Sequence, residues 1–108
     1  MHRSRVLKTL GKWRSNSYRS VSWSELVSVL ESLGFNVKPK DGTEYLISHH
    51  VLAANPPDFS PAGAFVVHKP HKRGDSVDPG PMKKKIIPAI EMVLQSLSME
   101  DETHEADY

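Results

Sequence analysis

Four side chains near the ends of two predicted strands have the chemistry to cleave a phosphodiester by acid–base catalysis. Glu44 lies at the start of one predicted strand, and His68, Lys69 and His71 lie at or just beyond the end of another. The start of one strand faces the end of its antiparallel neighbour, so we expect these side chains to lie close together. A carboxylate can take the proton of a ribose 2′-hydroxyl, a histidine can act as the acid, and a lysine can hold the phosphate.

A simpler interpretation of the same residues is structural. Glu44 and Lys69 on an exposed sheet would form a cross-strand charge pair, which is worth about 0.2–1 kcal/mol. Both interpretations fit the sequence.

The histidines also raise the question of a metal site. His49, His50, His68 and His71 are close in the chain, but no carboxylate is interleaved with them at the spacing of a metal motif. A zinc site needs at least three converging ligands. We therefore expect ordinary exposed histidines, and we predict no metal and no other cofactor.

Three consecutive lysines, Lys83, Lys84 and Lys85, are called the lysine triplet below. They fall in the first turn of a predicted helix, where positive charge is unfavourable by about 0.3–1 kcal/mol per residue. A bound phosphate would explain them, and a solvated face is the alternative. The predicted RNA-binding residues are Lys69, Lys72, Arg73, Lys83, Lys84 and Lys85.

The elements that must position these residues follow from periodicity and turn signals. Ser22 and Glu25 have the spacing of a capping box, and an apolar stripe follows to Leu33, so we predict a helix over residues 22–33 that ends at Gly34. Strands are predicted over residues 35–40, 43–49 and 64–69, with a hairpin at Asp41-Gly42 and an edge position for the strand that contains Pro39. Residues 50–63 are expected to form a loop that covers a sheet edge or contacts a partner.

The last predicted helix follows Asp78-Pro79-Gly80-Pro81, and its apolar stripe begins at Met82. Pro88 lies inside this helix, where proline costs about 3 kcal/mol, so we expect a kink or a short break at Ile87–Pro88. The order helix, three strands, helix predicts an α+β fold. The simplest arrangement is a three-stranded antiparallel sheet with both helices packed on one face.

Charge is distributed unevenly along the 108 residues. We predict a basic extension over residues 1–20, one domain over 21–98 and an acidic disordered tail over 99–108; residues 1–99 hold 14 basic and 8 acidic side chains. The excess of basic side chains in residues 1–99 suggests a polyanionic partner such as nucleic acid. The alternative is that these charges only keep the protein soluble. Trp13 and Tyr18 in the basic extension could stack on single-stranded nucleic acid or pack onto the domain.

Composition excludes several classes of protein. The chain has no cysteine, which excludes a disulfide scaffold, a thiolate zinc site and a cysteine nucleophile. No apolar run approaches the roughly 20 residues that span a bilayer. The basic N-terminus lacks the apolar stretch of a secretory signal, so we expect a cytoplasmic protein without a membrane partner.

The order and spacing of these motifs resemble the HicA toxin family, small ribonucleases with a fold like that of double-stranded-RNA-binding domains. The matching segments lie between residues 22 and 95: Ser24-Glu25-Leu26-Val27, Leu30-Glu31-Ser32-Leu33-Gly34-Phe35, Lys40-Asp41-Gly42-Thr43, Lys69-Pro70-His71, Asp78-Pro79-Gly80 and Lys83-Lys84-Lys85-Ile86. The resemblance implies an RNA-binding protein of a type II toxin–antitoxin system, with RNA and an antitoxin protein as partners. It also implies an endoribonuclease, an mRNA interferase, as the activity.

Two departures from the family keep a second interpretation open. The family's catalytic histidine follows Gly-Ser directly, whereas here Glu44 follows Gly42-Thr43. The family joins its second and third strands by a short turn, whereas this chain inserts residues 50–63. The alternative is a non-catalytic module of the same fold that binds RNA or a protein. If the chain is catalytic, Glu44 is the expected base, with His71 or His68 as the acid.

Overall fold

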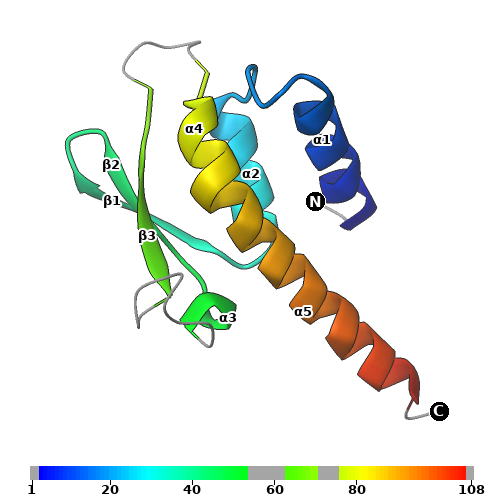
Figure 1. Cartoon of the computed structure of the whole chain (residues 1–108). Helices are drawn as coiled ribbons and strands as arrows, with labels where there is room; N and C mark the ends of the chain where they lie inside the picture. Colours follow the sequence, from blue (N-terminus) through cyan, green and yellow to red (C-terminus); the bar gives the residue numbers. More distant parts are fainter. Residues whose placement is uncertain (1–2, 54–62, 71–75, 107–108) are drawn as a thin grey trace.

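The computed structural model describes residues 3–53, 63–70 and 76–106, and side chains within residues 4–97 of those ranges. In these ranges three strands form one antiparallel sheet in the order β1 (Asn36–Asp41), β2 (Glu44–Ser48) and β3 (Ala64–His68). The helical elements are α1 (Arg3–Ser15), α2 (Trp23–Ser32), α3 (His50–Ala53), α4 (Pro79–Pro81), the π-helical turn η1 (Met82–Ile86) and α5 (Ile87–Ala106) (Figure 1). This confirms the predicted α+β class and the three antiparallel strands.

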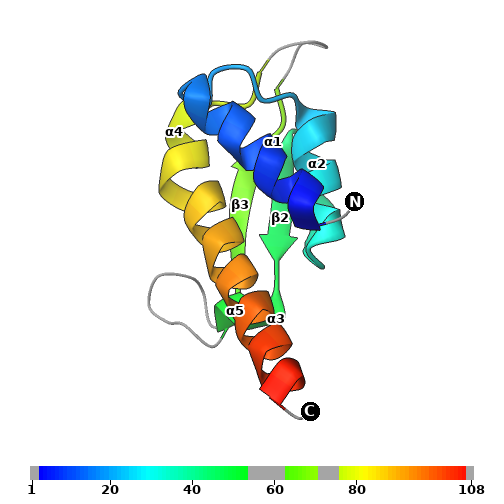
Figure 2. The same cartoon turned by 90° about the vertical axis from the view of Figure 1, so that its right-hand side faces the viewer.

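Helix α2 and the continuous helix formed by α4, η1 and α5 lie on the same side of the sheet (Figures 1 and 2). Ile47 and Val67 point into this layer and are buried. Tyr45, on the same face of β2, places its ring 4.8 Å from the ring of Trp23 in α2. Alternation along the strands therefore assigns odd-numbered residues of β2 and β3 to the helix-bearing face and even-numbered residues to the opposite, outer face.

Helix α2 begins and ends as the sequence predicts. The Ser22 hydroxyl accepts a hydrogen bond from the Glu25 backbone N–H at 3.2 Å. At the other end Phe35 N–H donates to the Leu30 carbonyl and Gly34 N–H to the Glu31 carbonyl, both at 3.0 Å. These two bonds form a Schellman motif, and Gly34 adopts the left-handed φ of 90° that the motif requires.

The β1–β2 hairpin forms at the predicted place, but its turn is shifted by one residue from the predicted Asp41-Gly42, because Asp41 still belongs to β1 and pairs with Glu44. Gly42 and Thr43 form the two-residue turn, and Gly42, with φ 55°, occupies the position that favours glycine in a type II′ turn. Pro39 lies in β1, which is an edge strand in the order of the sheet. The β1–β2 register shifts between Pro39 and Asp41, and this irregularity lies next to the turn.

The basic N-terminal segment is helical and packs onto the domain. Helix α1 lies across α2 and α5 on the side away from the sheet (Figure 2). Val6 and Trp13 are buried in the common core at 1% and 2% exposure. The Trp13 indole N–H donates to the Glu25 carboxylate of α2, and the Arg14 guanidinium lies 3.9 Å from the Glu91 carboxylate of α5. Trp13 is thus a packing residue, and its ring is not available for stacking on a nucleobase.

Pro88 produces a π-helical turn instead of a break. Proline lacks an N–H, and its ring crowds the carbonyl four residues earlier, here that of Lys84. The preceding turn η1 widens, and Ile87 N–H bonds to the Met82 carbonyl, five residues back. Asp78 caps the start of this helix through a 3.0 Å bond from Gly80 N–H. The helix is therefore continuous from Pro79 to Ala106.

Two segments differ from the expected irregular structure. The segment 50–63 begins with the short helix α3, whose Leu52 is fully buried; residues 54–62 lie outside the described residues. The backbone of α5 continues through residues 99–106, most of the segment that we expected to be a disordered tail. Within the described ranges, no helix is both long and apolar enough to cross a bilayer.

Candidate functional site

Glu44 and His68 face each other directly across β2 and β3. The register pairs their Cα atoms at the end of the sheet nearest the hairpin turn. The neighbouring Lys69 N–H donates to the Thr43 carbonyl at 2.8 Å, so Glu44 and His68 form a non-hydrogen-bonded pair. In such pairs the Cα atoms are only about 4.5 Å apart and the side chains are closest. The expected closeness of the candidate base and acid is therefore confirmed.

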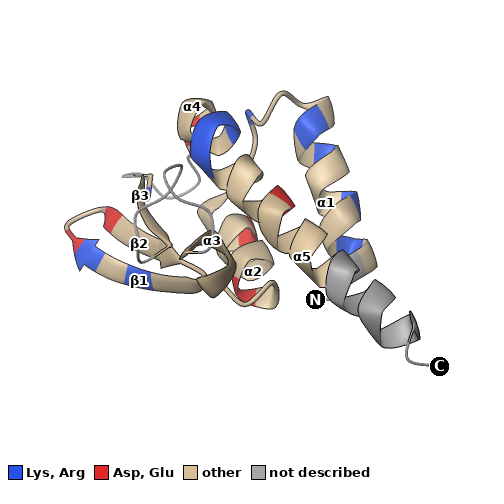
Figure 3. Cartoon of the chain, turned by 60° about the horizontal axis from the view of Figure 1, so that its bottom comes forward, with Lys and Arg blue, Asp and Glu red and all other residues tan. Residues whose placement is uncertain are grey.

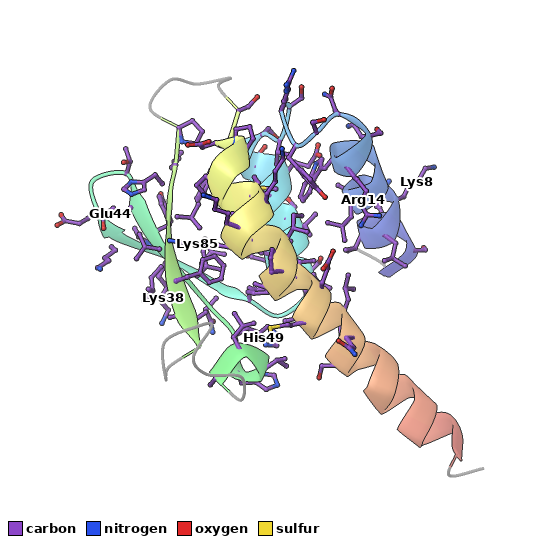
Figure 4. All side chains as sticks on the ribbon, in the orientation of Figure 1. Lys8, Arg14, Lys38, Glu44, His49 and Lys85 are labelled. Carbon is purple, nitrogen blue, oxygen red and sulfur yellow. The ribbon has the colours of Figure 1, made fainter. Side chains whose placement is uncertain are left out.

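This Glu44–His68 pair lies on the outer face of the sheet. Glu44 is half-buried and His68 is exposed. The next pair on that face is Leu46 with Val66, both half-buried. Figure 4 shows Glu44 at the hairpin, with its side chain pointing away from the helix layer. In the described ranges no hydrogen bond or ion pair joins the Glu44 carboxylate to another residue, so this group is open to a ligand that approaches from outside the sheet.

The predicted pairing of Glu44 with Lys69 is not formed. Lys69 lies opposite Thr43, one position beyond the Glu44–His68 pair. Because side chains alternate along a strand, Lys69 follows Val67 onto the helix-bearing side while Glu44 projects from the outer face. The other predicted residues at this end, His71, Lys72 and Arg73, lie outside the described residues.

The lysine triplet forms the exposed side of the π-helical turn. Lys83, Lys84 and Lys85 are all exposed, whereas Met82 and Ile86 on either side of them are fully buried. No acidic side chain among the described residues lies within ion-pairing distance of these three ammonium groups. The triplet belongs to the helix layer, whereas Glu44 and His68 project from the outer face of the sheet. The structure therefore presents two distinct candidate surfaces instead of one combined site.

His49 is buried, contrary to the expectation of an exposed histidine. It is 6% exposed and lies where β2 turns into α3. Its ring meets Phe35 edge-on with centroids 4.8 Å apart and stacks on His50 at 4.6 Å. The signal for this burial is the alternation in the strand: Tyr45, Ile47 and His49 follow one another at a spacing of two, and the first two face the core.

Both ring nitrogens of His49 are used by the backbone. Nδ1 accepts a hydrogen bond from Val51 N–H at 3.1 Å, and Nε2 lies 3.0 Å from the Leu33 carbonyl at the end of α2. Since Nδ1 accepts, Nε2 must carry the proton, and the ring is neutral. Burial lowers the pKa of His49 below its ordinary 6.5; the Leu33 carbonyl opposes this shift, and the neighbouring His50 adds to it. His49 is thus a structural clamp between α2, β2 and α3.

We predict that this clamp makes the fold less stable in acid. The pKa of His49 is lower in the folded chain than its ordinary 6.5, so the unfolded state binds more protons in the pH range just below 6.5. The contribution of neutral His49 to the free energy of unfolding is therefore fully present above pH 6.5. It decreases as the pH drops from 6.5 toward the lower pKa that His49 has in the folded chain. Urea unfolding of the wild type at pH 7.5, 6.5 and 5.5 measures this loss.

His49→Gln should flatten the pH dependence, and His50→Gln should keep most of it, because His50 is exposed and only adds to the shift at His49. Equal pH profiles for the wild type and His49→Gln would contradict the assignment.

The described residues contain no group of three or more histidine or acidic side chains placed to hold a metal ion. The resemblance to HicA toxins rests on the sequence motifs and on the order of the helices and strands. Comparison of the chain with protein-family models, with curated proteins and with solved structures finds no match to any of them.

Proposed function

We propose that this protein binds RNA through the lysine triplet, as a HicA-like member of a toxin–antitoxin pair. The observation that carries the proposal is the exposure of three adjacent ammonium groups on one π-helical turn, with no acidic partner among the described side chains. Buried Met82 and Ile86 fix the backbone of that turn in the core. Ammonium groups clustered on a fixed turn suit the phosphate backbone of RNA. Proteins recognise duplex RNA by shape and charge more than by sequence.

The proposal predicts a salt-dependent loss of RNA binding when Lys83, Lys84 and Lys85 are changed together to glutamine. Each lost phosphate contact lowers the slope of log Kobs against log salt by about 0.7–0.9, so three contacts lower it by roughly 2.1–2.7. Filter binding of a 20-base-pair RNA duplex between 50 and 300 mM salt measures both affinity and slope. Lys38→Gln with Lys40→Gln, two exposed lysines of β1, is the control for loss of charge alone. An unchanged slope in the triplet variant would remove the triplet from the RNA site.

A second candidate function, endoribonuclease, is favoured by one further observation, the direct cross-strand pairing of Glu44 and His68. In this reaction Glu44 takes the proton of a ribose 2′-hydroxyl while the 2′-oxygen attacks phosphorus. The bond from phosphorus to the 5′-oxygen breaks, His68 gives that oxygen a proton, and a 2′,3′-cyclic phosphate forms. Induced expression with an assay of cellular RNA integrity and growth tests this activity and the toxin role together.

A further inference from the structure

Helix α1 carries a row of cations that the proposed function does not use. Arg5, Lys8 and Lys12 are separated by three and four residues, which places them on one side of the helix. All three are exposed. The opposite side of α1 faces the core through Val6 and Trp13. Arg5, Lys8 and Lys12 are called the α1 stripe below.

Within the residues that the structure describes, the charge of this stripe is almost uncompensated. Helix α1 contains no acidic residue in its thirteen positions. The nearest ion pair joins Lys12 to Glu25 at 4.0 Å, with the lysine side chain 75% exposed, which is a weak surface contact. In the described part of the molecule, Arg5 and Lys8 have no acidic partner within ion-pairing distance. Like charges at these spacings destabilise a helix, so the sequence retains an arrangement that is unfavourable without a partner.

The surroundings of the stripe indicate the chemistry of that partner. Insertion into a lipid surface needs an outward apolar face, but Leu7 is the one large apolar side chain that is exposed among the described residues. A protein interface is typically anchored by aromatic side chains and depleted in lysine, and here the aromatic Trp13 is buried. A phosphodiester backbone needs neither feature, because charge supplies most of its non-specific affinity.

The dimensions of the stripe fit the same partner. Seven residues of helix extend about 10 Å at 1.5 Å per residue, which is long enough to lie along several phosphates of a nucleic-acid strand. Figure 3 shows basic residues on both α1 and η1, with the ribbon of α5 between them in that view. We propose that the α1 stripe is a second RNA-backbone contact surface, so that the protein binds RNA at two separate places, the stripe and the lysine triplet.

This inference rests on the proposed RNA binding, and the experiment separates the two. Arg5→Gln with Lys8→Gln removes the two cations of the stripe that have no acidic partner among the described residues. Glutamine has a helix propensity close to theirs, and both residues are exposed. The charge-matched control is Lys38→Gln with Lys40→Gln. With the 20-base-pair RNA duplex as the probe, the stripe variant should lower the salt slope by about 1.4–1.8. At 0.1 M salt its affinity should be roughly 25- to 60-fold lower than that of the wild type, taking equal affinities for the two chains at 1 M salt, and the control should change much less.

Circular dichroism and thermal unfolding confirm that each variant remains folded. A slope that is unchanged in the stripe variant but lowered in the triplet variant overturns the second surface and leaves the proposed function intact. Equal losses in the stripe variant and in the charge-matched control also overturn it, because net charge would then explain the effect. No binding of the duplex by the wild type overturns both proposals. Loss of binding to vesicles with one-third phosphatidylserine, with RNA binding unchanged, would assign the stripe to lipid headgroups and overturn the RNA surface.

Discussion

In a chain that cleaves RNA through the Glu44–His68 pair, Glu44→Gln lowers the cleavage rate by about 10²–10⁴-fold while RNA binding is retained. Glutamine keeps the shape of the side chain but cannot accept the proton of the 2′-hydroxyl. Glu44 is half-buried and has no ion pair among the described residues, so the free energy of unfolding should change by less than about 1 kcal/mol. Cleavage of a labelled RNA under single-turnover conditions measures the rate, and the same sequence as DNA, which lacks the 2′-hydroxyl, is the negative control.

Two further variants distinguish an active from an inactive scaffold. His68 lies directly across from Glu44 in the sheet. His68→Ala should therefore lower the cleavage rate if His68 is the acid. Glu44→His introduces the residue that the HicA resemblance implies, and growth arrest or RNA cleavage gained by this single change would reveal a scaffold that has lost only its base. Strong cleavage by the natural chain that is undiminished in Glu44→Gln would contradict a role for Glu44 and redirect attention to His68 and His71.

Gly63→Ala is expected to destabilise the fold by about 2–5 kcal/mol, the sum of backbone strain and overlap with neighbouring atoms. Gly63 has a φ of 67°, and an added Cβ would lie 2.5 Å from the His49 carbonyl oxygen and 2.6 Å from the Ala53 nitrogen. Those atoms belong to the rigid backbone of the turn into α3, where His49 N–H also donates to the Gly63 carbonyl. The overlap can be relieved only by moving the start of β3 away from α3.

Gly42→Ala is the matched control for this experiment. Gly42 has a similar φ of 55°, but nothing lies within 4 Å of an added Cβ. Its cost should be the backbone strain alone, about 1–2 kcal/mol. Urea unfolding of the two variants and the wild type at pH 7.5 gives the difference. Equal losses for the two glycines would show that the contact between Gly63 and the α3 turn does not constrain the fold.

The sequence predicts most of the domain fold because its signals there are local. The cap at Ser22, the glycine after α2 and the hairpin glycine each satisfy backbone geometry within a few residues, and the structure confirms all three. Helix α1 was harder to predict because Gly11 and the polar residues after it weaken the local signal. Its burial depends on Val6 and Trp13 reaching residues of α2 and α5, which are distant in the chain.

The candidate site was predicted in part for a similar reason. Strand order and direction are sufficient to place Glu44 near His68, and this closeness is confirmed. The position of Lys69 depends on register to within one residue, because each step along a strand reverses the face to which a side chain points. His49 was misjudged because its burial depends on the Leu33 carbonyl, which closes over the ring from the end of another helix.

The unbroken helix from Pro79 to Ala106 holds opposite charges at a fixed separation and so gives the molecule a charge dipole along the helix. Its sequence has the lysine triplet near one end and Glu100, Asp101, Glu102 and Glu105 near the other, and the backbones of Lys84 and Glu102 are about 27 Å apart at 1.5 Å per residue. Opposite charges at such a separation form a large permanent dipole. The field of a polyanion exerts a torque on this dipole and turns the lysine end toward the polyanion before contact. The π-helical turn at Pro88 preserves this dipole, because a broken helix would let the acidic end swing back and cancel it. Association should therefore be oriented as well as accelerated at low ionic strength.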